Sequence, residues 1–451
     1  MKRVGLIILL TTAVLVTAQQ PATKPPATKP PATPTSPVAL TQPPAAETPG
    51  RYVGVASCAN AGCHGSTQPL ETTKVLQNEY YTWLNNDRHA GAYNVLFSDR
   101  SARIARNMRL KKRAYEEAVC LDCHTTNLPG ASVSGAIDPE DGVQCEVCHG
   151  PASGWRNEHT EQGWTHEQSV ARGMIDLRSL NARGTVCAGC HMGNAKKEVD
   201  HELIASGHPI LPFELDNYTE SMPPHWSLRY EGARETHGLR AWAVGQVVMF
   251  REHLDNVARH ARGDEWPEFS DMSCYNCHHD LKGSTWRQER GWPDRAGLPA
   301  WSPQRWAVLR LILDRVSPGT RNELDSLVSQ VSLGVARMNN PSGTAAAADR
   351  ARALVTPLVA RVEAAQWDDG DVRALMNTIA NDSRVLADVH SAEQAALALQ
   401  SLASVRTRRD ARLLRGPLTR SIDALFEELK DRDEYEPSRF AAKLNAVRAN
   451  L

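Results

Sequence analysis

The ten cysteines of this 451-residue chain form five pairs, and a histidine directly follows the second cysteine of each pair. Four pairs have two residues between the cysteines, and the first has four. The motifs comprise Cys58, Cys63 and His64; Cys120, Cys123 and His124; Cys145, Cys148 and His149; Cys187, Cys190 and His191; and Cys274, Cys277 and His278. Two thiols so spaced can form thioethers to the haem vinyl groups, while the adjacent imidazole binds the iron. The sequence therefore predicts five covalently bound haem c groups and an electron-handling role.

Disulfides and zinc sites are the alternative uses of these cysteines. Five disulfides would suit an exported chain, and paired cysteines can build zinc sites. Neither chemistry requires a histidine after every second cysteine. All ten cysteines are used by the motifs, so we expect no disulfide. The first motif needs a longer loop to close on the same ring.

The histidines outside the motifs can supply the second axial ligand of each iron. They are the histidines at positions 89, 159, 166, 201, 208, 225, 237, 253, 260, 279 and 390. Ten of these eleven precede residue 300, and this excess favours bis-histidine ligation, which suits electron transfer. The preferred candidates are His89, His159, His208 and His237, the last at the start of a helical stretch.

The other histidines are weaker or ambiguous candidates for this role. His225 could be a ligand or could line the wall of a haem site. His253 and His260 are seven residues apart and would share one face of a helix. His279 directly follows His278, so it is not expected to reach the same iron.

The amino terminus has the features of an export signal. Lys2 and Arg3 precede an apolar run at 4–16, and small residues follow, which predicts a signal peptide at 1–18. The run is short for a membrane span, although an uncleaved anchor remains an alternative. Residues 19–50 are rich in Pro, Thr and Ala and should form a disordered tether. We expect a periplasmic or other extracytoplasmic location.

The remaining chain divides into two regions of different character. Residues 51–300 hold all the cysteines and should form a pentahaem domain with short helices and long loops, because each porphyrin supplies apolar area that side chains would otherwise provide. Residues 301–451 contain no cysteine and only one histidine, and they should form a haem-free helical bundle that is dispensable for haem attachment. The expected fold class is therefore mainly α.

Local signals place several helices in the second region. Ser302 and Pro303 predict a helix start, and apolar residues then recur at helical spacing through 306–316 and 324–338. A third helix at 345–365 should kink at Pro357. Ser391 and Gln394 have the spacing of a capping box. A last strong helical stretch covers 418–429.

The cysteine-rich region resembles the multihaem cytochromes of the cytochrome c-554 type. The matching segments are 52–54, 83–90, 142–151 and 201–209, and the resemblance covers about residues 51–230. It implies closely packed haems and electron transfer, and related folds occur in hydroxylamine oxidoreductase and the pentahaem nitrite reductases. The longer first motif, the fifth motif and the helical second region depart from the tetrahaem carrier.

The resemblance also implies a distribution of the second ligands. His159 would serve the first haem, while His89 and His208 would serve the third and fourth in an order that stays open. His237, His253 and His260 compete for the fifth haem. In this family the second haem lacks a sixth protein ligand, so the haem held by Cys120 and Cys123 could be open to small molecules.

Charge and composition narrow the function classes. The formal net charge is −1, and nothing suggests nucleic-acid binding. Seven basic residues at positions 100–113 could form a solvated face, counter haem propionates or bind an acidic redox partner. The favoured function is a periplasmic carrier between redox proteins. An oxidoreductase for a small nitrogen or sulfur compound, or a subunit of a larger or membrane-tethered complex, is the alternative.

Overall fold

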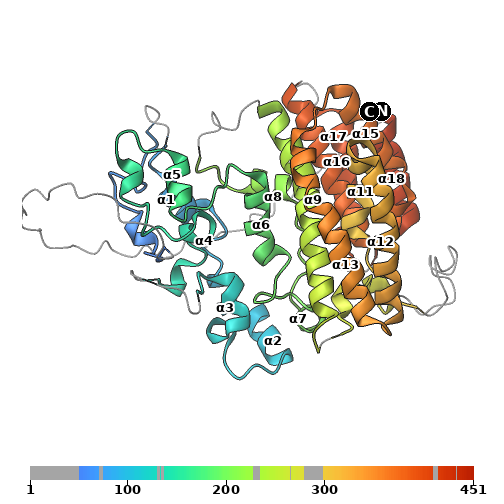
Figure 1. Ribbon diagram of the computed structural model, residues 1–451, viewed down its shortest axis with the longest axis horizontal. Coiled ribbons are helices and arrows are strands. Elements are labelled where there is room, and N and C mark those ends of the chain that lie inside the picture. Colours follow the sequence, from blue (N-terminus) through green and yellow to red (C-terminus); the bar gives the residue numbers. More distant parts are fainter. Residues whose placement is uncertain are drawn as a thin grey trace, which may run out of the picture. The chain divides into compact units, whose positions relative to one another are not determined.

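The computed structural model describes residues 50–70, 75–128, 133, 137–226, 234–264, 266–278, 298–409, 415–432 and 434–451 (Figure 1). This part of the chain is mainly helical, as the sequence predicted, and has isolated β-bridges but no strand. Within it, no helix combines the length and apolarity needed to cross a membrane. The signal peptide at 1–18, nearly all of the tether at 19–50, and His279 lie outside the described residues, so those expectations stay predictions.

The cysteine-rich region consists of short helices joined by longer loops. In chain order they are η1 (Val55–Ser57), α1 (Glu79–Asn86), η2 (Asn94–Phe97), α2 (Asp99–Asn107), η3 (Ala114–Glu116), α3 (Ala118–His124), η4 (Pro139–Asp141), α4 (Cys145–His149), η5 (Glu158–Thr160), α5 (His166–Ala171), α6 (Leu180–His191), α7 (His201–Ala205) and α8 (Leu215–Ser221). Side chains cap several starts: Ser98, Thr165 and Asp200 accept hydrogen bonds from the first turns of α2, α5 and α7.

Protein side chains supply little apolar core around the first motifs. Among the residues described in this region, three small clusters of buried side chains are found, for example Val53 with Ala152 and Trp155. A region of this length needs more apolar burial than such clusters provide to offset the entropy of folding. Bound porphyrins would supply that area, which agrees with the expected architecture of short helices around haem.

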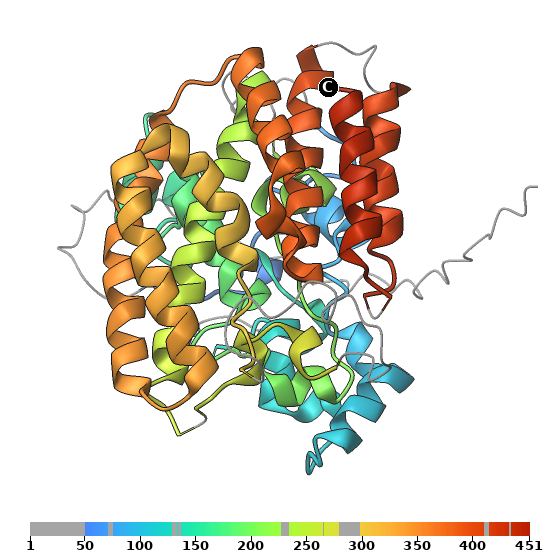
Figure 2. The same cartoon turned by 90° about the vertical axis from the view of Figure 1, so that its right-hand side faces the viewer.

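The second part of the fold is a set of long helices. It comprises α9 (Arg234–His260), η7 (Phe269–Asp271), η8 (Cys274–Asn276), α11 (Gln304–Val316), α12 (Pro318–Arg337), α13 (Pro341–Val355), α14 (Leu358–Ala364), α15 (Asp369–Asn381), η9 (Ser383–Leu386), α16 (Val389–Arg409), α17 (Pro417–Glu428) and α18 (Pro437–Ala449). Figure 2 shows the long helices running side by side with alternating directions.

Helix α9 joins the two regions, because it packs on both. On one side it contacts α6 and α8, and on the other it contacts α11, α13, α14 and α16 (Figure 1). Gly245 of α9 permits the first contact, since a Cβ at that position would lie 2.7 Å from Cβ of Leu215. Phe250 stacks on Trp306 of α11, with ring centres 5.2 Å apart. One hydrophobic core therefore runs across the boundary that the sequence predicted at residue 300.

Several helix limits in the bundle differ from the sequence expectations. Helix α11 begins at Gln304, and the Ser302 hydroxyl bonds to Asp388 at 2.8 Å instead of capping the helix. The cap of α16 is also Asp388, whose carboxylate accepts from the backbone N–H of Ser391 at 2.7 Å. Ser391 is fully buried inside the helix, so the predicted capping box is wrong. The expected kink at Pro357 is a full break between α13 and α14.

Candidate haem-binding site

Local helices present the three residues of most motifs on one face. The second, third and fourth motifs lie in α3, α4 and the last turn of α6. In an α-helix, residues three and four apart are neighbours, so both thiols and the histidine point the same way. The fifth motif begins with the single turn η8, and the longer first motif occupies turns after η1.

Each motif histidine faces one histidine from a distant part of the chain. The ring centres lie 6.1 Å apart for His64 and His159, 6.5 Å for His124 and His208, 6.4 Å for His149 and His225, 6.2 Å for His191 and His89, and 6.4 Å for His278 and His201. The relative ring tilts range from 7° to 87°. The five pairs therefore share one distance between ring centres but differ in ring tilt. Ring stacking cannot explain the common distance, because stacking would also fix the tilt.

This spacing fits an iron atom between two imidazoles. With metal–nitrogen bonds of about 2 Å, two axial histidines have ring centres about 6 Å apart. Stacked rings in van der Waals contact lie closer, as for His191 and Phe213 at 4.7 Å. The residues present thus fit haem at all five motifs.

Hydrogen bonds to Nδ1 orient several of these rings. Nδ1 of His64 bonds to Glu79 at 3.0 Å, and Nδ1 of His89 bonds to Asp87 at 2.9 Å. Backbone carbonyls serve the same purpose for His124, His159 and His208. A carbonyl or carboxylate at Nδ1 fixes the tautomer and leaves Nε2 for a metal. Histidines that bind a metal commonly have such a partner at the other ring nitrogen.

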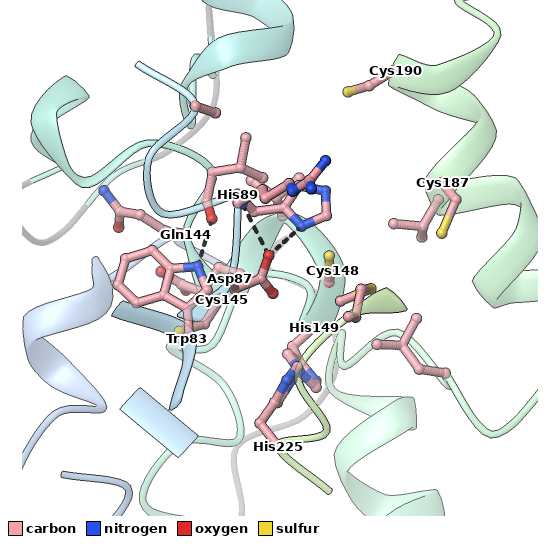
Figure 3. Close-up of a pocket in the computed structure, with 18 of the residues that line it drawn as sticks. Trp83, Asp87, His89, Gln144, Cys145, Cys148, His149, Cys187, Cys190 and His225 are labelled. Atoms are coloured by element: carbon pink, nitrogen blue, oxygen red, sulfur yellow. Dashed lines mark hydrogen bonds and ion pairs between the residues drawn. The ribbon is translucent and has the colours of Figure 1, made fainter. Parts of the chain in front are cut away.

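A single large cavity connects the first four motifs. Its volume is about 1790 Å³, and its lining includes both cysteines and the histidine of each of these motifs. Pockets for one small ligand are usually about 300–1,000 Å³, so this space suits several porphyrins. In Figure 3, His149 and His225 approach each other across it, while Cys187 and Cys190 project from one face of α6. The fifth motif does not line this cavity.

A buried carboxylate holds the first and third motifs together. Glu146, inside the third motif, accepts hydrogen bonds from the backbone N–H groups of Val53, Gly54 and Ala152 at 2.7–3.1 Å. Its neighbour Gln144 accepts from the N–H of Val55 at 2.9 Å. Hydrogen bonds to a charged acceptor are stronger than neutral ones. The chain before Cys58 is thereby fixed against α4.

Close backbone approach explains the glycine before the third motif. Gly142 has a φ of +63°, and a Cβ there would lie 2.5 Å from the carbonyl oxygen of His89. The N–H of Val143 donates to that same oxygen at 2.9 Å. The Trp83 indole donates to the carbonyl of Val143 at 3.2 Å (Figure 3). These contacts place His89 beside the third and fourth motifs.

The electrostatics of the buried rings favour neutral imidazole. Burial lowers the pKa of His149 and that of His191 to about 4, and neutral imidazole is the form that binds a metal. His89 differs, because its hydrogen bond to Asp87 raises its pKa despite burial. Burial alone would raise the pKa of Asp87, but its hydrogen bonds to His89 hold it below the ordinary value.

The fifth motif is built between the cysteine-rich region and the helical bundle. Its partner His201 begins α7, and its backbone N–H donates to Glu268 at 2.9 Å. Met272, just before the motif, forms a β-bridge with Trp301. From the bundle, Nε2 of His390 lies 3.5 Å from the sulfur of Cys274. The bundle therefore contacts an attachment residue, although the sequence predicted that it was dispensable for haem attachment.

A buried ionic cluster ties together the segments that carry His201 and the fifth motif. His260 of α9 bonds to Asp271 at 2.8 Å and contacts Glu198, which also takes two hydrogen bonds from Arg259 at 3.0 Å. Burial opposes a charge on His260, but the bonds to Asp271 and Glu198 raise its pKa to about 10. Glu198 and Asp271 each lie three residues before His201 and Cys274, respectively.

The sequence expectations for the second ligands agree with this geometry in part. His159 faces the first motif as expected, and His89 faces the fourth. His208 faces His124 of the second motif rather than the third or fourth. The family resemblance implied an open second iron, and the geometry does not support it, because a histidine ring stands in the sixth position.

Two of the facing histidines were not among the preferred candidates. His225, which could have been a ligand or a wall residue, faces the third motif, and His201 faces the fifth. His201 begins α7 and His208 follows its end, and two histidines placed so close to one short helix could have indicated two ligands. His237 lines the shared cavity, and the ring that faces His278 is that of His201, so the geometry does not support His237 as the fifth ligand.

His253 and His260 also differ from their expected role. His253 stacks on Trp301 with ring centres 5.3 Å apart, and burial lowers its pKa to about 4. His260 belongs to the ionic cluster. Both side chains are buried in the packing of α9, which explains why two histidines on one helix face need not be ligands.

Comparison with known proteins identifies the family of one segment. The family model described as cytochrome c554 and c-prime matches residues 57–150, which contain the first three motifs. No curated protein and no solved structure matches the chain. The matched residues include Gly142 and Glu146, whose contacts fix the first motif and His89 against the third motif. Residues 57–150 are therefore a c-type cytochrome segment of the cytochrome c554 family, whose covalently bound haem serves electron transport.

Proposed function

We propose that the protein is an exported pentahaem c-type cytochrome that transfers electrons between redox proteins through bis-histidine haems. The five pairs of facing histidine rings, with centres 6.1–6.5 Å apart, carry this proposal. Haem bound at such sites supplies reversible one-electron chemistry, and two histidine ligands favour transfer over catalysis. The chain contributes the thioether sulfurs, both axial imidazoles and the surroundings that keep them in place.

The attachment sites follow one another in space in a definite order. The neighbouring Cys58 thiol contributes to the raised pKa of Cys145, and the Cys187 thiol contributes to that of Cys148. Cys123 and Cys190 also affect each other, because the pKa of Cys123 is raised and that of Cys190 is lowered to about 6. This supports the sequence of first, third, fourth and second motif. The fifth follows the second, because α7 with its flanking turn carries both His201 and His208.

The geometry favours a carrier over an oxidoreductase. A haem that binds and converts a small substrate needs an open axial position and a polar pocket beside it. In the described residues a histidine ring stands opposite every motif histidine. An oxidoreductase and a subunit of a larger complex stay as alternatives from the sequence. The five pairs of facing histidine rings do not favour the oxidoreductase.

The proposed location rests on the amino terminus and on the chemistry of attachment. The apolar run at 4–16 and the small residues after it are typical of a secretory signal. We propose that the tether at 19–50 separates the folded cytochrome from this signal or from an anchoring complex. The proposed partners are redox proteins rather than nucleic acids.

Counting the haems tests this proposal. We expect the intact mass of the mature protein to exceed that of the polypeptide by five haem groups, because all ten cysteines are used in thioether bonds. A Cys58→Ala, Cys63→Ala double variant should lose one haem and keep four. A mass with four haems in the unmodified protein would remove the first motif from the proposal, and free thiols on several motifs would contradict it.

A further inference from the structure

The lobe at residues 94–124 exposes large apolar side chains around the second motif. It consists of η2, α2, η3 and α3, and we call it the second-motif lobe. Phe97 is 56% exposed and lies outside the haem cavity, whereas Val95 (50%) and Val119 (41%) line that cavity and would be covered in part by bound haem. Phe97 is held in place by Tyr115, with stacked rings 4.4 Å apart. Exposed apolar groups that are fixed together in this way are typical of protein interaction sites.

The same lobe carries a concentration of positive charge. Its basic residues are Arg100, Arg103, Arg106, Arg109, Lys111, Lys112 and Arg113. With four acidic residues at 99, 116, 117 and 122, the lobe has a formal charge of 7 − 4 = +3, whereas the whole chain has −1. Among the residues that the structure describes, none of the seven forms an ion pair.

Most of these charges are not needed to hold the fold. Arg100 donates to the carbonyl of Gly207, next to His208, and Arg113 donates to the Tyr115 hydroxyl. The side chains of Arg103 and Arg106 are exposed and lie on α2 without a hydrogen-bond partner among the described residues. Unpaired charges of one sign raise the positive potential outside the lobe. They are therefore available to an acidic partner.

This surface leads directly to the second attachment site. Val95, Arg100 and Val119 belong both to the lobe and to the lining of the haem cavity, and Val119 immediately precedes Cys120. A protein seated on the lobe would therefore reach the edge of the second site without crossing other parts of the chain. The positive charge alone, or the exposed apolar side chain alone, would not place a partner at the second-motif lobe. The two features occur together beside the second haem site.

We propose that the second-motif lobe is the docking surface for an acidic redox protein. The proposal rests on the proposed function, because it needs haem at Cys120 and Cys123. In each encounter one electron moves between the partner's redox centre and this haem, so that one centre is oxidised as the other is reduced. The positive charges speed the encounter, and the patch around Phe97 supplies the short-range contact.

Charge reversal on the lobe tests the proposal in the holoprotein. The probe is a reduced acidic flavodoxin, and the reduction of the ferric cytochrome is followed by stopped flow at low ionic strength. The Arg103→Glu, Arg106→Glu variant should react about tenfold more slowly, because electrostatic steering raises association rates by about 10–10³-fold. The matched control is Arg337→Glu, Arg373→Glu, which changes the charge equally at two exposed residues of the bundle and should react within about twofold of the unmodified protein.

A second variant separates docking from long-range attraction. Phe97→Ser should slow the reaction with flavodoxin but not with hexaammineruthenium(II), a small cationic reductant that needs no protein interface. If both charge variants slow the flavodoxin equally, or Phe97→Ser has no effect, the lobe is not the docking surface. The haem content is counted first, so a missing second haem would show a failure of the proposed function and not of the docking surface.

Discussion

A chain that ends at residue 300 should not accumulate as a soluble folded cytochrome. Helix α9 would keep its apolar residues but lose the helices α11, α13, α14 and α16 that cover them. Trp242, Phe250 and Leu254 are fully buried, and burial of such a side chain contributes about 1.5–3 kcal/mol. Exposing these three alone would cost about 5–9 kcal/mol, comparable with the usual total of about 5–15 kcal/mol.

Expression with a signal peptide, followed by gel filtration and absorption spectra, checks this expectation. Two single substitutions calibrate it in the full chain. Phe250→Ala should lower the free energy of unfolding by about 3–5 kcal/mol, because it opens a cavity against Trp306. Phe97→Ala, at an exposed position where only the ring contacts with Tyr115 and Tyr93 are lost, should lower it by no more than about 1.5 kcal/mol. A monomeric red fragment 51–300 with a cooperative unfolding transition would contradict the shared core.

Replacing His260 with glutamine should destabilise the protein by about 3 kcal/mol. The substitution would leave Asp271 and Glu198 close together without the positive charge between them. Removing one partner from a buried ion pair costs about 3–5 kcal/mol, and the lower end applies because the Glu198 side chain is 27% exposed. The matched control is His166→Gln, whose pair with Asp176 is more exposed and should contribute at most about 1 kcal/mol.

The contribution of His260 should also depend on pH. Its pKa is raised from the usual 6.5 to about 10, so the folded protein holds this proton more strongly than the unfolded chain does. The stabilisation is fully present below pH 6.5 and is lost as the pH rises through about 10. Asp271, Glu198 and Arg259 are the charged groups that face it.

Denaturant unfolding followed at the Soret band measures both effects. The difference between the unmodified protein and His260→Gln should be largest at about pH 6 and should shrink as the pH rises towards 10. The His166→Gln difference should stay small throughout. Equal losses for the two variants, or a His260→Gln difference that grows with alkaline pH, would mean that the cluster does not hold the fifth site together.

The attachment residues could be predicted from the sequence because their chemistry is local. Thioether bonds and the proximal ligand require a short contiguous motif, so Cys145, Cys148 and His149 are recognisable without any fold. The opposite ligands come from distant segments. His208 could be named as a candidate, but its place opposite His124 depends on how α2 and α7 pack, which sequence spacing does not contain.

The fifth ligand shows which physical information was missing. His237, His253 and His260 lie on one long helix, and the sequence made them the candidates for the second ligand of the fifth haem. That helix turns its apolar face to the bundle, and His253 and His260 are used there for packing and for the ionic cluster. His201 begins α7, and its backbone N–H donates to Glu268. This contact joins residues far apart in the chain and cannot be recognised from the local sequence.

Helical periodicity was the more reliable guide in the bundle. It predicted α11, α12 and α17 closely, because their apolar faces bury a common core. Phe440, Leu444 and Val447 carry the same signal in α18, which lies beyond the last helix expected at 418–429. What periodicity could not provide was the sharing of α9 between two regions, since that depends on close contacts such as Gly245 with Leu215.

Electron paramagnetic resonance of the oxidised holoprotein distinguishes two histidine ligands at every iron, as we propose, from an iron with an open position. The paired rings predict low-spin ferric signals only, and no carbon monoxide binding after reduction. His201→Ala should create one high-spin haem that binds carbon monoxide, whereas His237→Ala should leave all haems low-spin. A high-spin signal in the unmodified protein, or one created by His237→Ala and not by His201→Ala, would show that the paired rings are not the ligands.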